Sequence, residues 1–205
     1  MGEPYVVFEN TDDVPDELAA IQAAAATWNS AGAKFKFTYG GSSTNPAPLF
    51  DDVNEIRWGT MPGTVAASLT YWFNTATPQD ILEVDLVFNN DYTWSTSATT
   101  PAGAFDLQSA MLHQFGGYLA LGKSDIPEAV MYSFPPMGTQ RRTLHADDRA
   151  GIKAIYGSAC SAIGLSADVI SQGLGQAIVN VVLLFSTVLL VPLGRVLLRN
   201  ARLPF

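Results

Sequence analysis

The sequence predicts an α+β domain followed by a separate hydrophobic segment at the C-terminus. Apolar residues recur at three- and four-residue steps in three stretches, which is typical of helices, and alternate with polar residues in others, which is typical of strands. One helix and several strands come first, and a helix, an irregular stretch and a last helix follow, an order that favours an α+β fold. A long uncharged run near the end predicts the hydrophobic segment.

The first helix is predicted over residues 14–30. Pro15 stands near its start, and Asp16 and Glu17 suit the positive end of the helix dipole. Alanine, the strongest helix former, fills the middle. Four residues at helical spacing are expected to form the buried face: Leu18, Ile21, Ala25 and Trp28.

Strands are predicted after this helix, because the pattern changes to a period of two. Phe35, Phe37 and Tyr39 alternate with polar residues, which indicates a half-buried strand. Further strands are predicted over residues 54–59, 66–73 and 83–88. Loops are predicted over residues 40–48 and 89–104, which are rich in small polar residues, glycine and proline.

Two more helices are predicted, over residues 106–120 and 146–156. Asp147 and Asp148 lie in the first turn of the last helix, where carboxylates cap the helix and offset its dipole, and Gly157 is its predicted stop. A stretch with three prolines separates the two helices and is expected to be irregular.

Composition and charge restrict the class of protein. Of the 205 residues 48% are hydrophobic and 15% charged, which excludes disorder over most of the length. The net charge of -8 argues against a nucleic-acid partner, because phosphate contacts need clustered Lys and Arg. All acidic residues lie at or before Asp168, so residues 1–168 carry 8 basic and 19 acidic groups (8 - 19 = -11), whereas the rest carries three arginines. Cys160 is the only cysteine, so an internal disulfide is excluded.

The C-terminal segment is expected to span a membrane. The run from Val169 to Gly194 has no charge, and about 20 apolar residues suffice to cross a bilayer core of about 30 Å. We expect residues 158–176 to be a linker and 177–205 to be a transmembrane helix with a basic tail in contact with lipid. The arginines that follow the run favour a cytoplasmic C-terminus and an exported domain, 1–157, at the cell surface. The alternative is a hydrophobic helix that packs on the domain.

Export requires a signal, and none is visible in Met1–Tyr5, which lacks a basic start and an apolar run. We therefore expect the signal to have been removed from this sequence.

The segment from Phe105 to Gly157 resembles the matrixin-like branch of the metzincin zinc metalloproteases. That family carries the motif H-E-x-x-H-x-x-G-x-x-H on its active-site helix and a Met-turn after it. Phe105–Ser109 resembles the entry to that helix, Ala129–Tyr132 the Met-turn, and Leu144–Gly157 the closing helix. More weakly, Ala26–Asn29 resembles the family's first helix and Asp85–Phe88 its substrate-side edge strand. The resemblance implies a metzincin-like fold over residues 1–157: a twisted mixed sheet of about five strands, three helices and a Met-turn.

The zinc motif itself is degraded. His113 matches the first zinc ligand, but Gln114 stands at the general-base Glu, and Gly117 and Lys123 stand at the other two ligands. Ala120 replaces the glycine of the motif. A catalytic zinc needs three protein ligands and an open position for water, and a glutamine does not accept a proton from that water. We therefore expect no bound zinc and no hydrolysis, although the resemblance implies zinc in the parent family.

Other residues do not replace the missing ligands in the sequence. His145 lies at the start of the last helix, and Asp125 is two residues past the third ligand position. Calcium is a further candidate ligand, with five aspartates in loops available but not spaced as an ordered calcium loop; these are Asp12, Asp13, Asp51, Asp52 and Asp91.

The sequence thus indicates a metalloprotease-like pseudoenzyme anchored in a membrane. We expect it to bind an extended peptide along its edge strand, in a cleft lined by Val84 and Leu86 and, beyond the Met-turn, by Met131 and Tyr132. For Tyr132 a core position is the alternative, and for Lys123 the choice is between a charge in the metal's place and a solvated side chain. Two other readings stay open: an active zinc endopeptidase with other ligands, and a protease inactivated by design.

Overall fold

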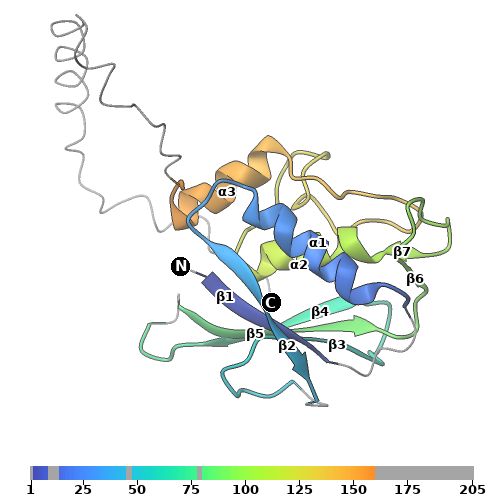
Figure 1. The fold of residues 1–205 in the computed structure, drawn as a ribbon, viewed down its shortest axis with the longest axis horizontal. Coiled ribbons are helices and arrows are strands. Elements are labelled where there is room, and N and C mark those ends of the chain that lie inside the picture. Colours follow the sequence, from blue (N-terminus) through green and yellow to red (C-terminus); the bar gives the residue numbers. More distant parts are fainter. Residues whose placement is uncertain (1, 9–13, 45–47, 78–79, 160–205) are drawn as a thin grey trace, which may run out of the picture. The chain divides into compact units, whose positions relative to one another are not determined.

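A computed structural model describes residues 2–8, 14–44, 48–77 and 80–159 (Figure 1). The chain divides into two units, Met1–Cys160 and Ser161–Phe205. The first is an α+β unit with a mixed sheet and three helices, as predicted. In the part of the chain that is described, no helix has the length and apolar character needed to cross a membrane. The predicted transmembrane helix lies outside the described residues, as does the predicted linker beyond Ala159.

The sheet has five strands in the order β2-β1-β3-β5-β4. Strand β4 runs antiparallel to β5, and the other pairings are parallel. The bounds are Gly2–Phe8 for β1, Lys36–Ser43 for β2, Glu55–Gly59 for β3, Ala67–Phe73 for β4 and Ile81–Asn89 for β5. Sequence analysis missed β1 and assigned residues 40–43 to a loop. Pairing with β1 extends β2 through these glycine and serine residues, because a backbone ladder needs no β-forming side chain.

The predicted edge strand is not at the edge. Strand β5, which contains residues 83–88, lies between β3 and β4, so β4 is the edge strand on this side of the sheet. Val84 and Leu86 are accordingly buried, at 2% and 0% exposure, and belong to the hydrophobic core. The assignment of residues 83–88 to a cleft-lining edge was therefore wrong.

Three helices cover one face of the sheet (Figure 1). They are α1, Glu17–Asn29, α2, Leu107–Tyr118, and α3, Ala146–Tyr156, and all three lie within the predicted ranges. On α1 three of the four predicted face residues, Ile21, Ala25 and Trp28, are buried, whereas Leu18 is 38% exposed and Glu17 is buried instead. Short strands β6 (Trp94–Ser95) and β7 (Phe105–Asp106) pair with each other just before α2.

The core lies between the helices and the helix-facing side of the sheet. Side chains alternate along a strand, so Val84, Leu86 and Phe88 of β5 face the helices. Phe37 of β2 contacts Phe115 of α2, with ring centroids 4.3 Å apart. Trp28 of α1 is 1% exposed, and its indole N–H donates to the backbone oxygen of Leu112 at 2.8 Å. Burying each such large side chain contributes roughly 1.5–3 kcal/mol, which fixes α2 firmly on the sheet.

Candidate functional site

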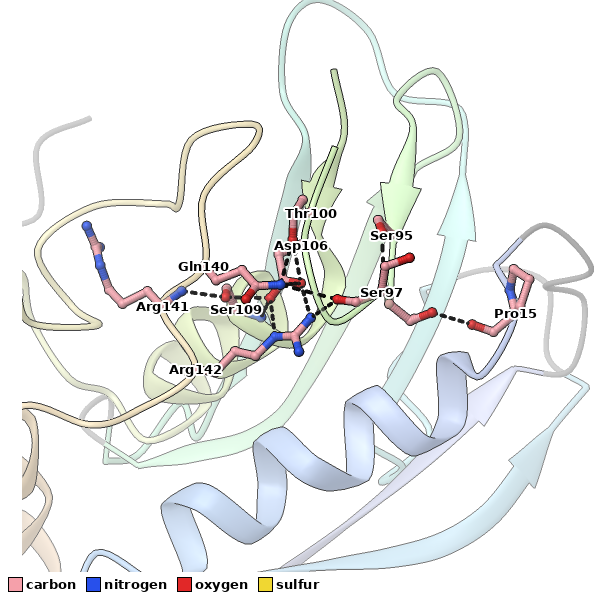
Figure 2. A network of polar contacts seen from close by, with 10 residues as sticks. Pro15, Ser95, Ser97, Thr100, Asp106, Ser109, Gln140, Arg141 and Arg142 are labelled. Atoms are coloured by element: carbon pink, nitrogen blue, oxygen red, sulfur yellow. Dashed lines mark hydrogen bonds and ion pairs between the residues drawn. The ribbon is translucent and has the colours of Figure 1, made fainter. Parts of the chain in front are cut away.

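Helix α2 begins at a buried carboxylate that has a complete set of hydrogen-bond donors. Asp106 is fully buried at the N-cap, and its Oδ2 accepts the backbone N–H of Ser109 at 2.9 Å. Arg142 forms two hydrogen bonds to the same carboxylate, one of them from Nε at 2.9 Å (Figure 2). Burial raises the pKa of Asp106, but the hydrogen bonds from Arg142 and Ser109 outweigh it, and the pKa lies below its usual value.

The same network ties the segment after the Met-turn to the start of α2 (Figure 2). Arg142 Nη2 also donates to the backbone oxygen of Ser97 at 2.8 Å, and Gln140 Nε2 donates to the hydroxyl of Thr100 at 2.9 Å. The backbone N–H of Arg141 donates to Ser109 Oγ at 2.7 Å. Sequence analysis did not single out these residues, because their partners lie more than thirty positions away.

His113 projects from the middle of α2 and is held by the Met-turn. Its Nδ1 donates to the backbone oxygen of Val130 at 2.8 Å, since a carbonyl only accepts. The ring of Phe134 meets the imidazole edge to face, with centroids 5.8 Å apart. Burial lowers the pKa of His113, and Arg141 and Lys123 lower it further. At neutral pH the ring is therefore uncharged, and Nε2 keeps a lone pair.

The Met-turn is held from two sides. Two of its backbone N–H groups, those of Val130 and Met131, donate to the buried carboxylate of Asp148 at 2.9 and 3.0 Å. Met131 packs against Gly116 of α2, where an added Cβ would collide with the Met131 sulfur. Asp148 also accepts the backbone N–H of His145 at 2.8 Å and thus caps α3, as predicted. Its hydrogen bonds to the Met-turn were not foreseen.

The space beside Gly117 is filled by the edge strand. A Cβ at Gly117 would collide with Leu69 Cδ1 and would lie 3.1 Å from Tyr71 Oη. Leu69 and Tyr71 are two residues apart on β4, so both face α2. Burial raises the pKa of Tyr71 to about 12, so its hydroxyl stays protonated and is available as a donor. A strand prediction over 66–73 places the two side chains on one face, but their approach to Gly117 required the tertiary structure.

Helix α2 ends in a Schellman motif built on an alanine. The N–H of Leu121 donates to the oxygen of Gly116 at 3.0 Å, and the N–H of Ala120 donates to the oxygen of Gly117 at 2.8 Å. This turn needs a left-handed residue, and Ala120 adopts it with φ 56. A residue with a Cβ costs about 1 kcal/mol or more in this conformation. Ala120, which stands at the position of the motif glycine, therefore strains the backbone at this turn.

The other predicted site residues are spread around α2. Gln114 is 7% exposed, and Lys123 is exposed. Lys123 lines a cavity of about 200 Å³ together with Asp147, and among the described residues it forms no ion pair. Tyr132 is 42% exposed, so it is not a core tyrosine, whereas Met131 is buried beneath α2.

A second buried ion pair lies on the face of the sheet opposite the helices. Arg57 Nη2 of β3 and Asp85 Oδ2 of β5 are 3.8 Å apart, and both side chains are at most 3% exposed. Asp85 accepts the backbone N–H of Glu55 at 3.0 Å, but its Oδ2 and all three nitrogens of Arg57 have no hydrogen-bond partner among the described residues. Burial, with smaller contributions from the charges of Glu55 and Glu83, raises the pKa of Asp85 to about 6.

These residues do not fit zinc. His113 offers one donor atom, Gly117 offers none, and the volume of a second ligand is taken by Leu69 and Tyr71. In the described part of the chain no group of three or more His, Cys, Asp or Glu is arranged to hold a metal ion. The same finding applies to the loop aspartates considered for calcium, of which Asp12 and Asp13 lie outside the described residues.

Comparison with known proteins agrees with this framework. The family model described as Matrixin matches residues 5–157. Metalloendoproteinase 1 of Glycine max is 36% identical over 74 residues, which is 34% of this chain and 24% of that protein. Matrix metalloproteinase-25 of Homo sapiens is 33% identical over 78 residues, or 37% of this chain and 14% of that protein. Metalloendoproteinase 2-MMP of Arabidopsis thaliana is 38% identical over 55 residues, or 27% of this chain and 15% of that protein.

The matches to these relatives span a quarter or less of the relatives' length. The family model, in contrast, takes in both the sheet and all three helices of the first unit. It includes the capped start of α2, the Met-turn and the closing helix, which are the features that hold His113 in place. By its matched residues and its fold, this chain belongs to the matrixin family.

Proposed function

We propose that the first unit is a catalytically inactive matrixin domain that binds extended peptides along β4 and is anchored at a membrane surface. The main evidence for the loss of activity is the glycine at position 117 and the side chains that pack against it. Glycine there supplies no ligand atom, and Leu69 and Tyr71 have closed over the helix at that point. A metal would need to displace two packed side chains to reach a site with one remaining imidazole.

The general base is missing as well. Gln114 matches the shape of a glutamate, but its amide does not take a proton from water at neutral pH. Lys123 brings a cation to the third ligand position, where a dication would have to bind. Each of these three changes lowers activity independently, so the proposal does not depend on any one of them.

Peptide binding is supported by the position of β4. Among the described strands it pairs with β5 alone, so its other edge offers backbone N–H and C=O groups. An extended peptide that adds to such an edge gains main-chain hydrogen bonds, a recurring mode of peptide recognition. The strongly acidic balance of residues 1–168 favours peptides with basic residues.

Membrane anchoring rests on the sequence of residues 177–205. We propose that this hydrophobic segment spans the bilayer, with the domain outside the cell and the arginines at 195, 199 and 202 inside. Fractionation of the full chain without detergent tests this part. Recovery in the membrane pellet is expected, and a soluble monomer would show that the segment packs as a protein helix.

Metal content tests the inactivity. The purified full chain, dialysed against zinc, is expected to hold far less than one zinc per molecule and to cleave no peptide in a mixed-sequence library. Gln114→Glu alone should leave both results unchanged, because the ligand set stays short. Stoichiometric zinc together with cleavage would establish the active endopeptidase instead.

A second comparison tests the role of β4 in excluding metal. The double variant Gly117→His/Lys123→His restores the ligand types, and cobalt can report tetrahedral binding by its visible spectrum. We expect weak cobalt binding, which improves when Leu69→Ala is added. Tight binding by the double variant without that addition would show that β4 is no obstacle.

A further inference from the structure

We propose that four basic side chains of the first unit form a docking surface for anionic lipid headgroups and set how the domain faces the bilayer. We call this surface the basic cluster, and its members are Lys34, Lys36, Arg149 and Lys153. The inference rests on the proposed membrane anchoring, because it names the part of the first unit that meets the bilayer. It adds a second contact to the hydrophobic segment, which anchors the chain but does not orient the domain.

One half of the basic cluster lies on a single face of α3. Arg149 and Lys153 are four residues apart in this helix, and residues at that spacing lie one above the other. Arg149 Nη1 donates to the backbone oxygen of Ser30 at 3.2 Å. Lys153 Cε lies 3.2 Å from the position that a Cβ would take at Gly32. Both side chains therefore reach the turn that follows α1.

The other half comes from the chain that leads from this turn into β2. The Lys36 amine donates to a backbone oxygen at the end of α1, and Lys34 Cδ lies 3.7 Å from the position of a Cβ at Gly157. Both lysines are exposed, whereas Arg149 and Lys153 are half-buried. Four cations from two segments that are distant in the sequence thus meet around one turn.

The basic residues of the acidic domain are concentrated at this place. Of the eight basic residues in 1–168, two are in ion pairs with aspartates, and four of the other six belong to the basic cluster. Residues 29–48 and 149–160 contain no acidic residue. Asp147 stands two residues before Arg149 and therefore lies on the other side of α3. The cluster thus concentrates positive charge in a domain that is otherwise acidic.

The last described residues of the chain lie beside the basic cluster. The N–H of Lys34 donates to the oxygen of Gly157 at 2.9 Å, and the N–H of Ala159 donates to the oxygen of Gly32 at 2.7 Å. Residues 160–176 stand between this point and the proposed membrane span, which is at most about 60 Å of extended chain. A tether of this length keeps the domain at a high effective concentration beside the bilayer, so weak contacts suffice for docking.

Electrostatics favour one orientation of the tethered domain. Each Lys or Arg close to an anionic membrane improves binding about fivefold, and the attraction falls off within a Debye length of about 8 Å. The acidic remainder of the domain is repelled by the same surface. Lys36 belongs to β2, which is the edge of the sheet opposite β4. Docking through the basic cluster therefore keeps the proposed peptide-binding edge away from the bilayer.

The lysines of the chain allow a direct test, because three of the four belong to the basic cluster. The fourth, Lys123, lines a cavity with Asp147 on the other side of α3 and is an internal control. The full chain is placed in nanodiscs of phosphatidylcholine alone or with about one-third phosphatidylglycerol, and acetylation of each lysine is followed by mass spectrometry. We expect the three cluster lysines to react at least about fivefold more slowly in the anionic discs, and Lys123 to react equally in both. Salt at about 0.5 M should remove the difference.

Single-charge variants separate lipid contact from packing. Lys153→Gln removes one charge, so labelling of Lys34 and Lys36 in the anionic discs should speed up by as much as about fivefold. Lys153→Arg keeps the charge and should protect both lysines as the native residue does. Lys123→Gln removes the same charge outside the basic cluster and should have no effect. Equal recovery of labelling in Lys153→Arg and Lys153→Gln would show that packing is responsible, and it would overturn the inference.

The result in native protein distinguishes this inference from membrane anchoring. A full chain that enters the discs but reacts alike in both lipids, or with all four lysines slowed equally, would overturn the inference and leave the anchoring intact. Protection by inorganic phosphate in neutral discs would overturn the assignment to lipid and indicate a site for free anions. A full chain that stays outside the discs as a soluble monomer would overturn the anchoring and this inference together.

Discussion

Two equally buried carboxylates in the first unit have pKa values shifted in opposite directions. At the start, the fully buried Asp106 accepts hydrogen bonds from Ser109, Thr100 and Arg142, and its pKa is lowered. On the face of the sheet opposite the helices, the equally buried Asp85 lies 3.8 Å from Arg57, and its pKa is raised to about 6. Burial is the same in both places. The number of donors within hydrogen-bond distance decides whether the charged form is stabilised.

The chain also follows the matrixin pattern in some parts of the structure and departs from it in others. The start of α2, the Met-turn and the cap of α3 are joined by short hydrogen bonds and keep the framework. Of the departures, Gln114 lies within α2 beside His113, whereas Gly117, Ala120 and Lys123 lie at or beyond the end of the helix. The structure thus preserves the part that holds His113 and has lost the part that would complete a metal site.

The largest effect on stability is expected from removing the Arg142 side chain from the hydrogen-bond network around Asp106. Arg142→Met leaves the Asp106 carboxylate buried without its cation, and we expect a loss of about 3 kcal/mol in the free energy of unfolding. Urea unfolding of the full chain measures it. Arg149→Met is the control, because the hydrogen bond from Arg149 to Ser30 is exposed. A loss no larger than that of the control would show that the network contributes little.

The next effect concerns the pH dependence of stability and the Arg57–Asp85 pair, which lacks several hydrogen-bond partners among the described residues. Because the pKa of Asp85 is raised in the folded protein, its stabilising contribution is present below pH 4 and is lost as the pH rises through about 6. The two-unit difference corresponds to at most about 3 kcal/mol. Asp85→Asn should therefore flatten the decline in stability between pH 4 and 7, whereas the exposed Asp91→Asn should not. Identical slopes for both variants would contradict the raised pKa.

A smaller effect, a gain in stability, is expected when both members of the Arg57–Asp85 pair are replaced. Arg57→Met/Asp85→Leu replaces a buried pair in which Asp85 Oδ2 and the three Arg57 nitrogens lack hydrogen-bond partners among the described residues. Replacing such a pair by apolar side chains of similar size is neutral or stabilises by about 1–2 kcal/mol. Arg142→Met/Asp106→Leu is the matched double variant at the start of α2 and should be destabilising. Thermal unfolding of both variants at pH 7 compares them directly. Equal losses of stability would show that the two buried pairs do not differ in their contribution.

The smallest effect is expected at the backbone. Ala120→Gly relieves the left-handed alanine that closes α2, and we expect a gain of about 1 kcal/mol. Ala150→Gly, at an exposed position inside α3, should instead lose about 1 kcal/mol. If both substitutions destabilise the protein, the turn after α2 carries no strain.

The helices were predictable because their signals are local. Alanine content, the acidic first turns and the glycine after α3 act over a few residues, and α3 has the predicted bounds. The burial pattern in the first turn of α1 and the strand β1 were not predictable in this way. Exposure of Leu18 and burial of Glu17 depend on what packs against the first turn, and β1 is defined by its neighbours on both sides.

The candidate site divides along the same line. The sequence by itself determined that ligand atoms are absent at 117 and changed at 123, because donor atoms belong to residue types and no fold supplies them to a glycine. Only the tertiary structure decided which strand forms the edge and that Leu69 and Tyr71 of that strand fill the space beside Gly117. Strand order and the contact of Leu69 and Tyr71 with Gly117 depend on pairings between segments that are distant in the sequence. A local sequence pattern does not specify those pairings.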